Sequence, residues 1–211
     1  MSRLSLRVDV PLCSLRPFEA RDYQETLPAP PPATVFGMLL SMAGVDGDRV
    51  GHFVGNRLGL AIQEEPPVST VLRKMRRDAA SSELTKQGIP QFRPEYQELL
   101  SGLTFWVDIE RQPDAPEDLA ETVRRAIEEP ESVDRYGALS LGESAFMVDA
   151  VSIVDAPPED VLVLRPSEGG FLTMPVWTDF QDRSRTELRR FDLVEGELAE
   201  DDLVRIGPAE E

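Results

Sequence analysis

Four prolines precede an apolar run in the stretch TLPAPPPATVFGMLLSMAG, residues 26–44. Proline fixes φ at about −65° and lacks an amide proton, so Pro30–Pro32 predict a rigid extended segment that ends in the first turn of a helix. Apolar residues then recur at helical spacing, in one row of Val35, Leu39 and Met42 and a parallel row of Phe36, Leu40 and Ala43. The pattern predicts a helix over residues 32–43, with Gly44 as its stop signal.

Gly37 is unusual inside this helix, because a mid-helix glycine costs about 1 kcal/mol relative to alanine. Such a residue indicates that something approaches the backbone closely. We expect a neighbouring sheet to pack there, by analogy with the glycines of phosphate-binding turns, and a bound ligand is the alternative.

Single cysteine and histidine residues, Cys13 and His52, exclude an internal disulfide and make a Cys/His metal site unexpected. Alternating apolar residues from Leu4 to Val10 predict a strand over residues 3–13 and do not resemble a signal peptide. No later segment reaches the ~18 apolar residues of a membrane span. We therefore expect a cytoplasmic protein that needs no metal or other cofactor and has no membrane partner.

The formal net charge of −17 is unevenly distributed. Residues 1–110 carry 12 basic and 14 acidic side chains (net −2), whereas residues 111–211 carry 10 and 25 (net −15). A polyanionic partner could therefore dock on the first half, because local potential decides binding. The acidic end, EGELAEDDLVRIGPAEE, is most simply a solvated tail, with a basic protein partner as the alternative.

The remaining periodicity predicts an α+β fold. We expect strands at 57–63, 68–75, 99–110 and 145–155, a turn or edge at Pro66-Pro67, and a helix at 117–129. The order strand, helix, strand, strand, helix, strand is the ferredoxin-like (βαββαβ) arrangement. Polar residues at about 76–95 predict a long hairpin-like insertion. We assign residues 1–160 to one domain and residues 161–211 to a β-rich C-terminal extension with an acidic tail.

Catalysis is not signalled, because no nucleophile with a base and no pair of carboxylates stands out. A metal-free ribonuclease could combine Tyr23, His52 and Lys86 from separate loops.

The densest basic run is RKMRR, residues 73–77, followed by Lys86 and Arg93. It could contact phosphates or protect an exposed strand edge. The segment RYGALSLGES, residues 135–144, could bind phosphate through freed backbone amides or simply form a turn.

Several of these segments resemble one known family. Phe18, Arg21 and the proline-rich stretch are similar to the N-terminal signature of the family-five Cas subunit of type I CRISPR interference complexes (Cascade). VLRKMRR, PEYQELLSGLTFWVD, RYGALSLGES and LTMPVW resemble its DevS-like, type I-B branch, so the likeness covers most of residues 3–178.

The resemblance implies a RAMP-type ferredoxin-like domain with an extended thumb hairpin. It implies a non-catalytic subunit that holds the 5′ handle of CRISPR RNA, caps the backbone filament and adjoins the large subunit that reads the protospacer-adjacent motif. The implied partners are CRISPR RNA, backbone subunits, the large subunit and target DNA near that motif, in antiviral defence or RNA-guided transposition. Some type I-C relatives process precursor RNA, so an endoribonuclease is the alternative; here Gln87 follows Lys86, and no Lys-His pair exists.

The resemblance also assigns RNA-binding roles by position. Arg73 and Arg77 share one strand face and are expected to matter more than Lys74 and Arg76. Unpaired bases could stack on Tyr23, Phe92 or Tyr96. The residues implied for RNA binding are Arg16 and Arg21 for handle phosphates, Thr34 and Gly37 on the helix, Arg73, Lys74, Arg76, Arg77, Lys86 and Arg93 on the thumb and its base, and Arg135, Gly142 and Ser144 in the glycine-rich loop.

Overall fold

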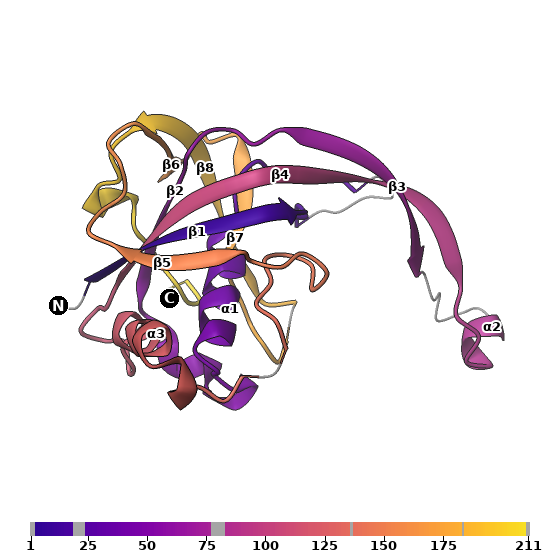
Figure 1. Cartoon of the computed structure of the whole chain (residues 1–211), viewed down its shortest axis with the longest axis horizontal. Coiled ribbons are helices and arrows are strands. Elements are labelled where there is room, and N and C mark those ends of the chain that lie inside the picture. Colours follow the sequence, from indigo (N-terminus) through magenta and orange to yellow (C-terminus); the bar gives the residue numbers. More distant parts are fainter. Residues whose placement is uncertain (1–2, 19–23, 77–82, 136, 183, 210–211) are drawn as a thin grey trace.

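The computed structural model describes residues 3–18, 24–76, 83–135, 137–182 and 184–209. These residues form a mixed α/β fold dominated by one β-sheet (Figure 1). The strands of that sheet follow the order β5-β1-β4-β2-β6-β8-β7, with β3 paired to β4 and β9 paired to β2. Among the described residues, no helix has the length and apolar character needed to cross a membrane.

The elements follow one another along the chain as β1 (Arg3–Cys13), α1 (Pro32–Met42), η1 (Gly47–Phe53), β2 (Arg57–Ile62), β3 (Val68–Arg76), α2 (Glu83–Lys86), β4 (Phe92–Glu110), α3 (Leu119–Glu128), η2 (Pro130–Ser132), β5 (Ala150–Val154), β6 (Val161–Pro166), β7 (Leu172–Thr178), β8 (Thr186–Gly196), η3 (Glu200–Asp202) and β9 (Val204–Arg205).

The predicted first strand and first helix are both confirmed. Alternate residues of β1, including Leu4, Leu6 and Val8, are buried in the main core, which α1 and α3 share on one side of the sheet (Figure 1). Pro31 is the extended N-cap of α1, Pro32 occupies its first turn, and the helix ends one residue earlier than predicted. The proline block therefore fixes where α1 starts and how it lies against the sheet.

A long hairpin projects from one end of the molecule (Figure 1). Its arms are β3 and the first half of β4, paired from Val68 with Leu100 to Arg76 with Phe92. The short helix α2 lies near the tip. The predicted insertion is thus a hairpin whose paired arms begin at Val68. Among its described residues, the exposed large apolar side chains are those of Val68, Leu72, Ile89, Phe92 and Tyr96.

The C-terminal third is more ordered than predicted. The extension predicted as β-rich includes the long strand β8, in which the buried Phe191 anchors a segment whose neighbours Arg189 and Arg190 are exposed. The expected strand over 145–155 is shorter and begins at Ala150. The proposed boundary at residue 160 stays a prediction, since β6 pairs with β2 in the same sheet.

The acidic tail is not a solvated end, and that prediction was wrong. Leu198, Leu203, Val204 and Ile206 are buried, and β9 pairs with β2. The carboxylate of Asp202 accepts a hydrogen bond of 2.7 Å from Arg165 Nε. Scattered apolar residues among the charges thus attach the segment to the sheet, and arginine side chains neutralise part of its acidity.

Candidate functional site

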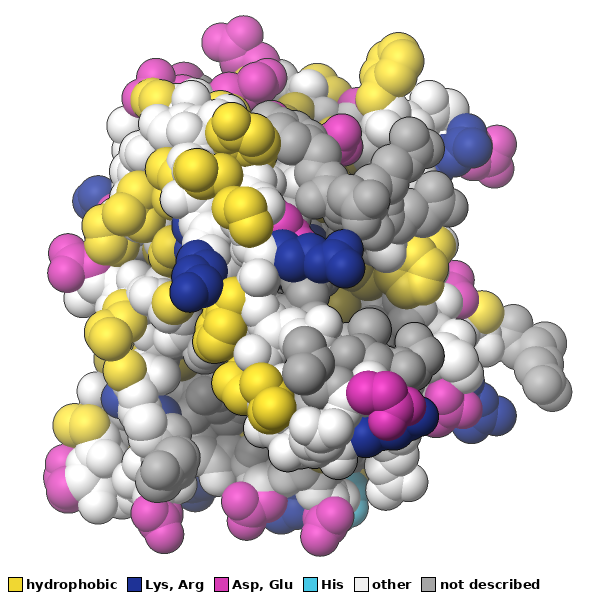
Figure 2. Space-filling view, turned by 90° about the vertical axis from the view of Figure 1, so that its right-hand side faces the viewer, with side chains coloured by type: hydrophobic (Ala, Val, Ile, Leu, Met, Phe, Trp, Pro, Cys, Tyr) yellow, Lys and Arg dark blue, Asp and Glu magenta, His cyan; other side chains and the backbone are white. Residues whose placement is uncertain are grey.

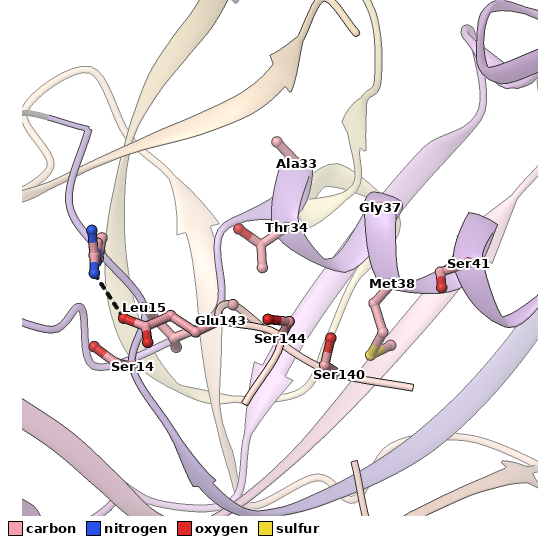
Figure 3. A pocket seen from close by; sticks show the side chains of 12 residues that line it. Ser14, Leu15, Ala33, Thr34, Gly37, Met38, Ser41, Ser140, Glu143 and Ser144 are labelled. Atoms are coloured by element: carbon pink, nitrogen blue, oxygen red, sulfur yellow. Dashed lines mark hydrogen bonds and ion pairs between the residues drawn. The ribbon is translucent and has the colours of Figure 1, made fainter. Parts of the chain in front are cut away.

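Three segments that are distant in sequence line one pocket of about 730 Å³ (Figure 3). They are the loop after β1, the exposed face of α1, and the loop before β5. Five residues predicted for RNA binding meet here, namely Arg16, Thr34, Gly37, Gly142 and Ser144; the other lining residues are Ser14, Leu15, Ala33, Met38, Ser41, Ser140 and Glu143.

The pocket is rich in hydroxyl groups. The side chains of Thr34, Ser41, Ser140 and Ser144 make no hydrogen bond to any part of the chain that the structure describes. Ser14 is 1% exposed, and its Oγ has no hydrogen-bond partner among the described atoms. Hydroxyl groups and backbone N–H groups donate to phosphate and sugar oxygens, so this lining suits a phosphodiester chain.

Gly37 faces the pocket and not the sheet. A Cβ added there would meet no atom within 4 Å. The expectation of tight packing between helix and sheet was therefore wrong, because the two apolar rows of α1 turn the opposite side of the helix toward the core. The ligand alternative is the one that fits the open space in front of this residue.

Glycine is required at position 142 for a structural reason. Its φ is +78°, and a Cβ there would lie 2.5 Å from the backbone oxygen of Ser14. Only glycine adopts this conformation readily at such a close approach. Gly142 therefore lets the loop before β5 pack directly against the loop after β1, which closes one wall of the pocket.

Glu143 holds together the basic residues of the site. Its Oε1 accepts hydrogen bonds from Arg16 at 2.9 Å and from Gln97 Nε2 at 2.6 Å, and its Oε2 accepts one from Arg73 at 3.1 Å. Arg73 also donates to Gln97 Oε1 and lies 5.6 Å from the ring centroid of Phe146. Arg73 thus reaches the pocket from the base of the hairpin.

The ionisation of Glu143 follows from these contacts. Partial burial by itself raises the pKa of this carboxyl, but the charge of Arg16 and the hydrogen bonds from Arg16, Gln97 and Arg73 outweigh it and leave the pKa below its usual value. The carboxylate is therefore ionised at neutral pH. It occupies, between two arginines, the position that a phosphate group would suit.

Glu143→Gln should lower the stability of the free protein at pH 7 by about 1 kcal/mol, because two partly buried arginines lose their ionic partner. Since the folded-state pKa is depressed, this contribution is present above the unfolded pKa and is lost as pH falls through the folded value. Thermal unfolding between pH 7 and pH 3.5 checks this: the difference between the two proteins should shrink toward the acid end.

The matched control for this variant is Glu121→Gln. Glu121 is exposed on α3 and lies 3.9 Å from Arg124, so its loss should change stability little at any pH. A Glu143→Gln difference that stayed constant down to pH 3.5 would show that the charge of Glu143 does not stabilise the loop.

The other predicted residues lie elsewhere. Arg135 lines a second pocket. Lys74 Nζ lies 5.0 Å from the ring centroid of Phe92, and Lys86 pairs with Glu83 at 2.6 Å on the hairpin. Arg93 is exposed on β4. Arg76 ends β3, its side chain is not described, and Arg21 and Arg77 lie outside the described residues.

Of the residues considered for a ribonuclease, His52 and Lys86 are described and lie apart. His52 Nδ1 lies 2.8 Å from Glu117 Oε1, just before α3, whereas Lys86 ends α2 near the tip of the hairpin (Figure 1). Tyr23 lies outside the described residues. Hydrogen bonds from Arg49 and His52 lower the pKa of Glu117, so the Glu117 carboxylate serves as an ion-pair partner of these side chains.

Cys13 and potential metal ligands add no further site. Cys13 is fully buried, and burial raises the pKa of its thiol to about 12, so it stays protonated. Within the described ranges, no three His, Cys, Asp or Glu side chains gather in a way that could hold a metal ion.

Sequence reasoning missed several members of the site, among them Ser14, Gln97 and Glu143. Gln97 is fully buried on β4, and Glu143 lies inside the glycine-rich loop that had been selected for its glycines. A polar residue at a strand position that is otherwise apolar was the available signal for Gln97. Nothing local marks Glu143, because its partners are distant in the chain.

The distribution of charged side chains on the face at the hairpin end differs from what the acidic net charge of the chain suggests. Figure 2 shows basic and hydrophobic side chains together near the middle of this face, with most acidic side chains around its rim. The acidic net charge of the chain therefore does not prevent an anion from approaching here.

Comparisons with known proteins agree with one another. No family model matches the chain. It is 36% identical over 180 residues to the CRISPR-associated protein Cas5 of Myxococcus xanthus (strain DK1622), covering 83% of each chain. A chain of a CRISPR RNA-guided surveillance complex has a similar fold, with a TM-score of 0.64 and 17% identity. The match covers 98% of this chain and 94% of that chain. A crystal structure of a Cas protein also has a similar fold, with a TM-score of 0.52 and 19% identity; the match covers 99% of this chain and all of that chain.

Proposed function

The chain belongs to the Cas5 family of CRISPR-associated proteins, and from this premise we propose that it binds CRISPR RNA as a subunit of a Cascade complex. The observation that carries the proposal is the convergence at one pocket. Arg16, the exposed face of α1 and the Gly142–Ser144 loop line it, and Glu143 ties Arg73 to its edge. Together they offer two guanidinium groups, several hydroxyl donors and an unobstructed helix face to an RNA backbone.

The bound segment in this proposal is the 5′ handle, and the protein caps the backbone filament. The sheet order β5-β1-β4-β2, with α1 and α3 against one face, supports a ferredoxin-like RAMP domain over residues 1–160. Residues 161–211 would then be an extension of the same sheet. The type I-B branch, the contact with the large subunit and proximity to target DNA are further parts of the same proposal.

The hairpin is the proposed contact with a backbone subunit. One face of it carries the apolar side chains of Leu72, Phe92 and Tyr96, all exposed, with Lys74 beside them. An exposed apolar strip on a projecting hairpin is typical of a surface that a protein partner or unpaired bases cover. A scaffold role fits better than catalysis, since His52 and Lys86 lie far apart.

Purification with neighbouring subunits tests the proposal. The tagged full chain, co-expressed with its adjacent CRISPR-associated subunits and a CRISPR array, should retain RNA whose sequenced 5′ ends all begin with the same repeat-derived segment. The same preparation of the chain carrying Arg16→Gln and Arg73→Gln should lose that segment. Complexes without RNA, or RNA with random 5′ ends, would contradict the proposal.

A further inference from the structure

A second pocket, of about 690 Å³, adjoins the first. The two share Ala33, Thr34, Gly37 and Ser41, so they lie on either side of one exposed face of α1. We propose that this second pocket receives one unpaired base of the bound RNA and favours a base with an exocyclic amino group. The inference rests on the proposed function, because it needs an RNA strand that crosses α1 at Gly37.

The lining of the second pocket suits a flat aromatic group. Phe36 and Leu40 are buried at the helix side, and Val45, Val50 and Pro175 add further apolar surface. These residues contrast with the hydroxyl-rich lining of the first pocket. A strand that crosses the helix face therefore meets a polar hollow that suits its phosphates and an apolar hollow that suits a base.

Phe180 provides a stacking surface beside this apolar lining. Its side chain is 63% exposed, which is costly for a phenylalanine in water. The ring lies so close to Gly47 that a Cβ there would be 2.5 Å from its Cε1 atom. The absence of a side chain at position 47 thus permits close contact, and this contact restrains the ring at the pocket. Exposed aromatic rings are the usual stacking partners of unpaired bases.

The charged residues on the pocket decide what enters it. Asp46 and Asp134 are exposed, and neither carboxylate makes a hydrogen bond or ion pair within the part of the chain that the structure describes. Asp179 is already engaged by the backbone N–H groups of Gln181 and Asp182. Free carboxylates repel phosphate groups but accept hydrogen bonds from amino groups.

This chemistry distinguishes the bases. Adenine, cytosine and guanine present exocyclic amino groups that donate to carboxylates, whereas uracil has carbonyl oxygens and a ring N–H but no amino group. Arg135, also on the pocket, adds one cation that can hold a phosphate next to the inserted base. The pocket should therefore favour adenine, cytosine or guanine over uracil at one position of the strand.

Three homopolymeric octaribonucleotides test the inference, since A8, C8 and U8 carry identical phosphates. With the full-length chain in fluorescence anisotropy, A8 and C8 should bind about 5- to 10-fold tighter than U8, as expected for one stacked and hydrogen-bonded base. Phe180→Ala should weaken the binding of A8 and C8 several-fold, because the inserted base loses its stacking partner, with the salt dependence unchanged. Asp134→Asn should narrow the preference for A8 and C8 over U8, because it removes a carboxylate that accepts hydrogen bonds from their amino groups.

Phe171→Ala is the matched control, because Phe171 is 95% exposed and does not line the pocket; it should leave all three affinities unchanged. Equal affinities for A8, C8 and U8, with binding still lost in the Arg16→Gln/Arg73→Gln variant, would overturn the base pocket and leave RNA binding standing. A Phe180→Ala variant that binds A8 and C8 as tightly as the wild type would also overturn it. No binding of any octamer would overturn both proposals.

Discussion

Replacing Arg16 and Arg73 together with glutamine should reduce affinity for CRISPR RNA by at least about 100-fold. Hydrogen bonds to charged groups contribute about 1.5–3 kcal/mol each, and about 1.4 kcal/mol corresponds to a factor of ten. Both guanidinium groups lie at the first pocket, 2.9 Å and 3.1 Å from the carboxylate of Glu143. A phosphate that replaces this carboxylate would take over both contacts.

The salt dependence gives a second measurement of the same effect. Each lost phosphate contact on a single strand lowers the slope of log affinity against log salt concentration by about 0.7. The double variant should therefore show a slope smaller by about 1.4. Lys86→Gln serves as the matched control, because Lys86 lies on α2 and is paired with Glu83. Its slope should fall by less than that of the double variant.

The carboxylate of Glu143 complicates the double variant, because it would remain without its arginine partners and would repel RNA. Adding Glu143→Gln removes that charge. The triple variant should recover stability relative to the double variant but should still fail to bind RNA. Wild-type affinity in the triple variant would contradict the assignment, since Arg16 and Arg73 would then serve only to neutralise Glu143.

The parts of the fold that depend on local pattern could be predicted from the sequence. The alternation of β1 and the proline-led helix α1 each signal one structure within a short window, and both lie where predicted. The strand β8 and the packed C-terminal segment were missed because their few buried residues, such as Phe191 and Ile206, are separated by charged ones. Their burial depends on pairing with distant strands, which no local window reveals.

Some residues of the candidate site were selected from the sequence, but its geometry was not predicted. Resemblance selected Arg16, Gly37 and Gly142, and the fold brings all three to one pocket. The role of Glu143 could not be predicted, because Arg16 is 127 positions away and Arg73 is 70 positions away in the chain. A contact between such distant residues depends on the whole topology.

Gly37→Ala should stabilise the free protein, whereas Gly37→Leu should weaken RNA binding at least about tenfold, equivalent to ~1.4 kcal/mol. Alanine gains about 1 kcal/mol of helix propensity over glycine, and no atom lies within 4 Å of the added Cβ. Leucine should keep most of that gain, but its side chain would extend from the helix face that both pockets share. Thermal unfolding and RNA titration of both variants check the two effects separately.

Gly142→Ala is the informative contrast, because the two glycines line the same pocket for opposite reasons. At Gly142 a Cβ would lie 2.5 Å from the Ser14 oxygen at a φ of +78°, so this variant should lose stability. RNA binding would then fall through damage to the loop, whereas in Gly37→Leu it would fall in a protein at least as stable as the wild type. A stable Gly37→Leu variant with unchanged RNA affinity would show that the strand does not cross α1 at this position.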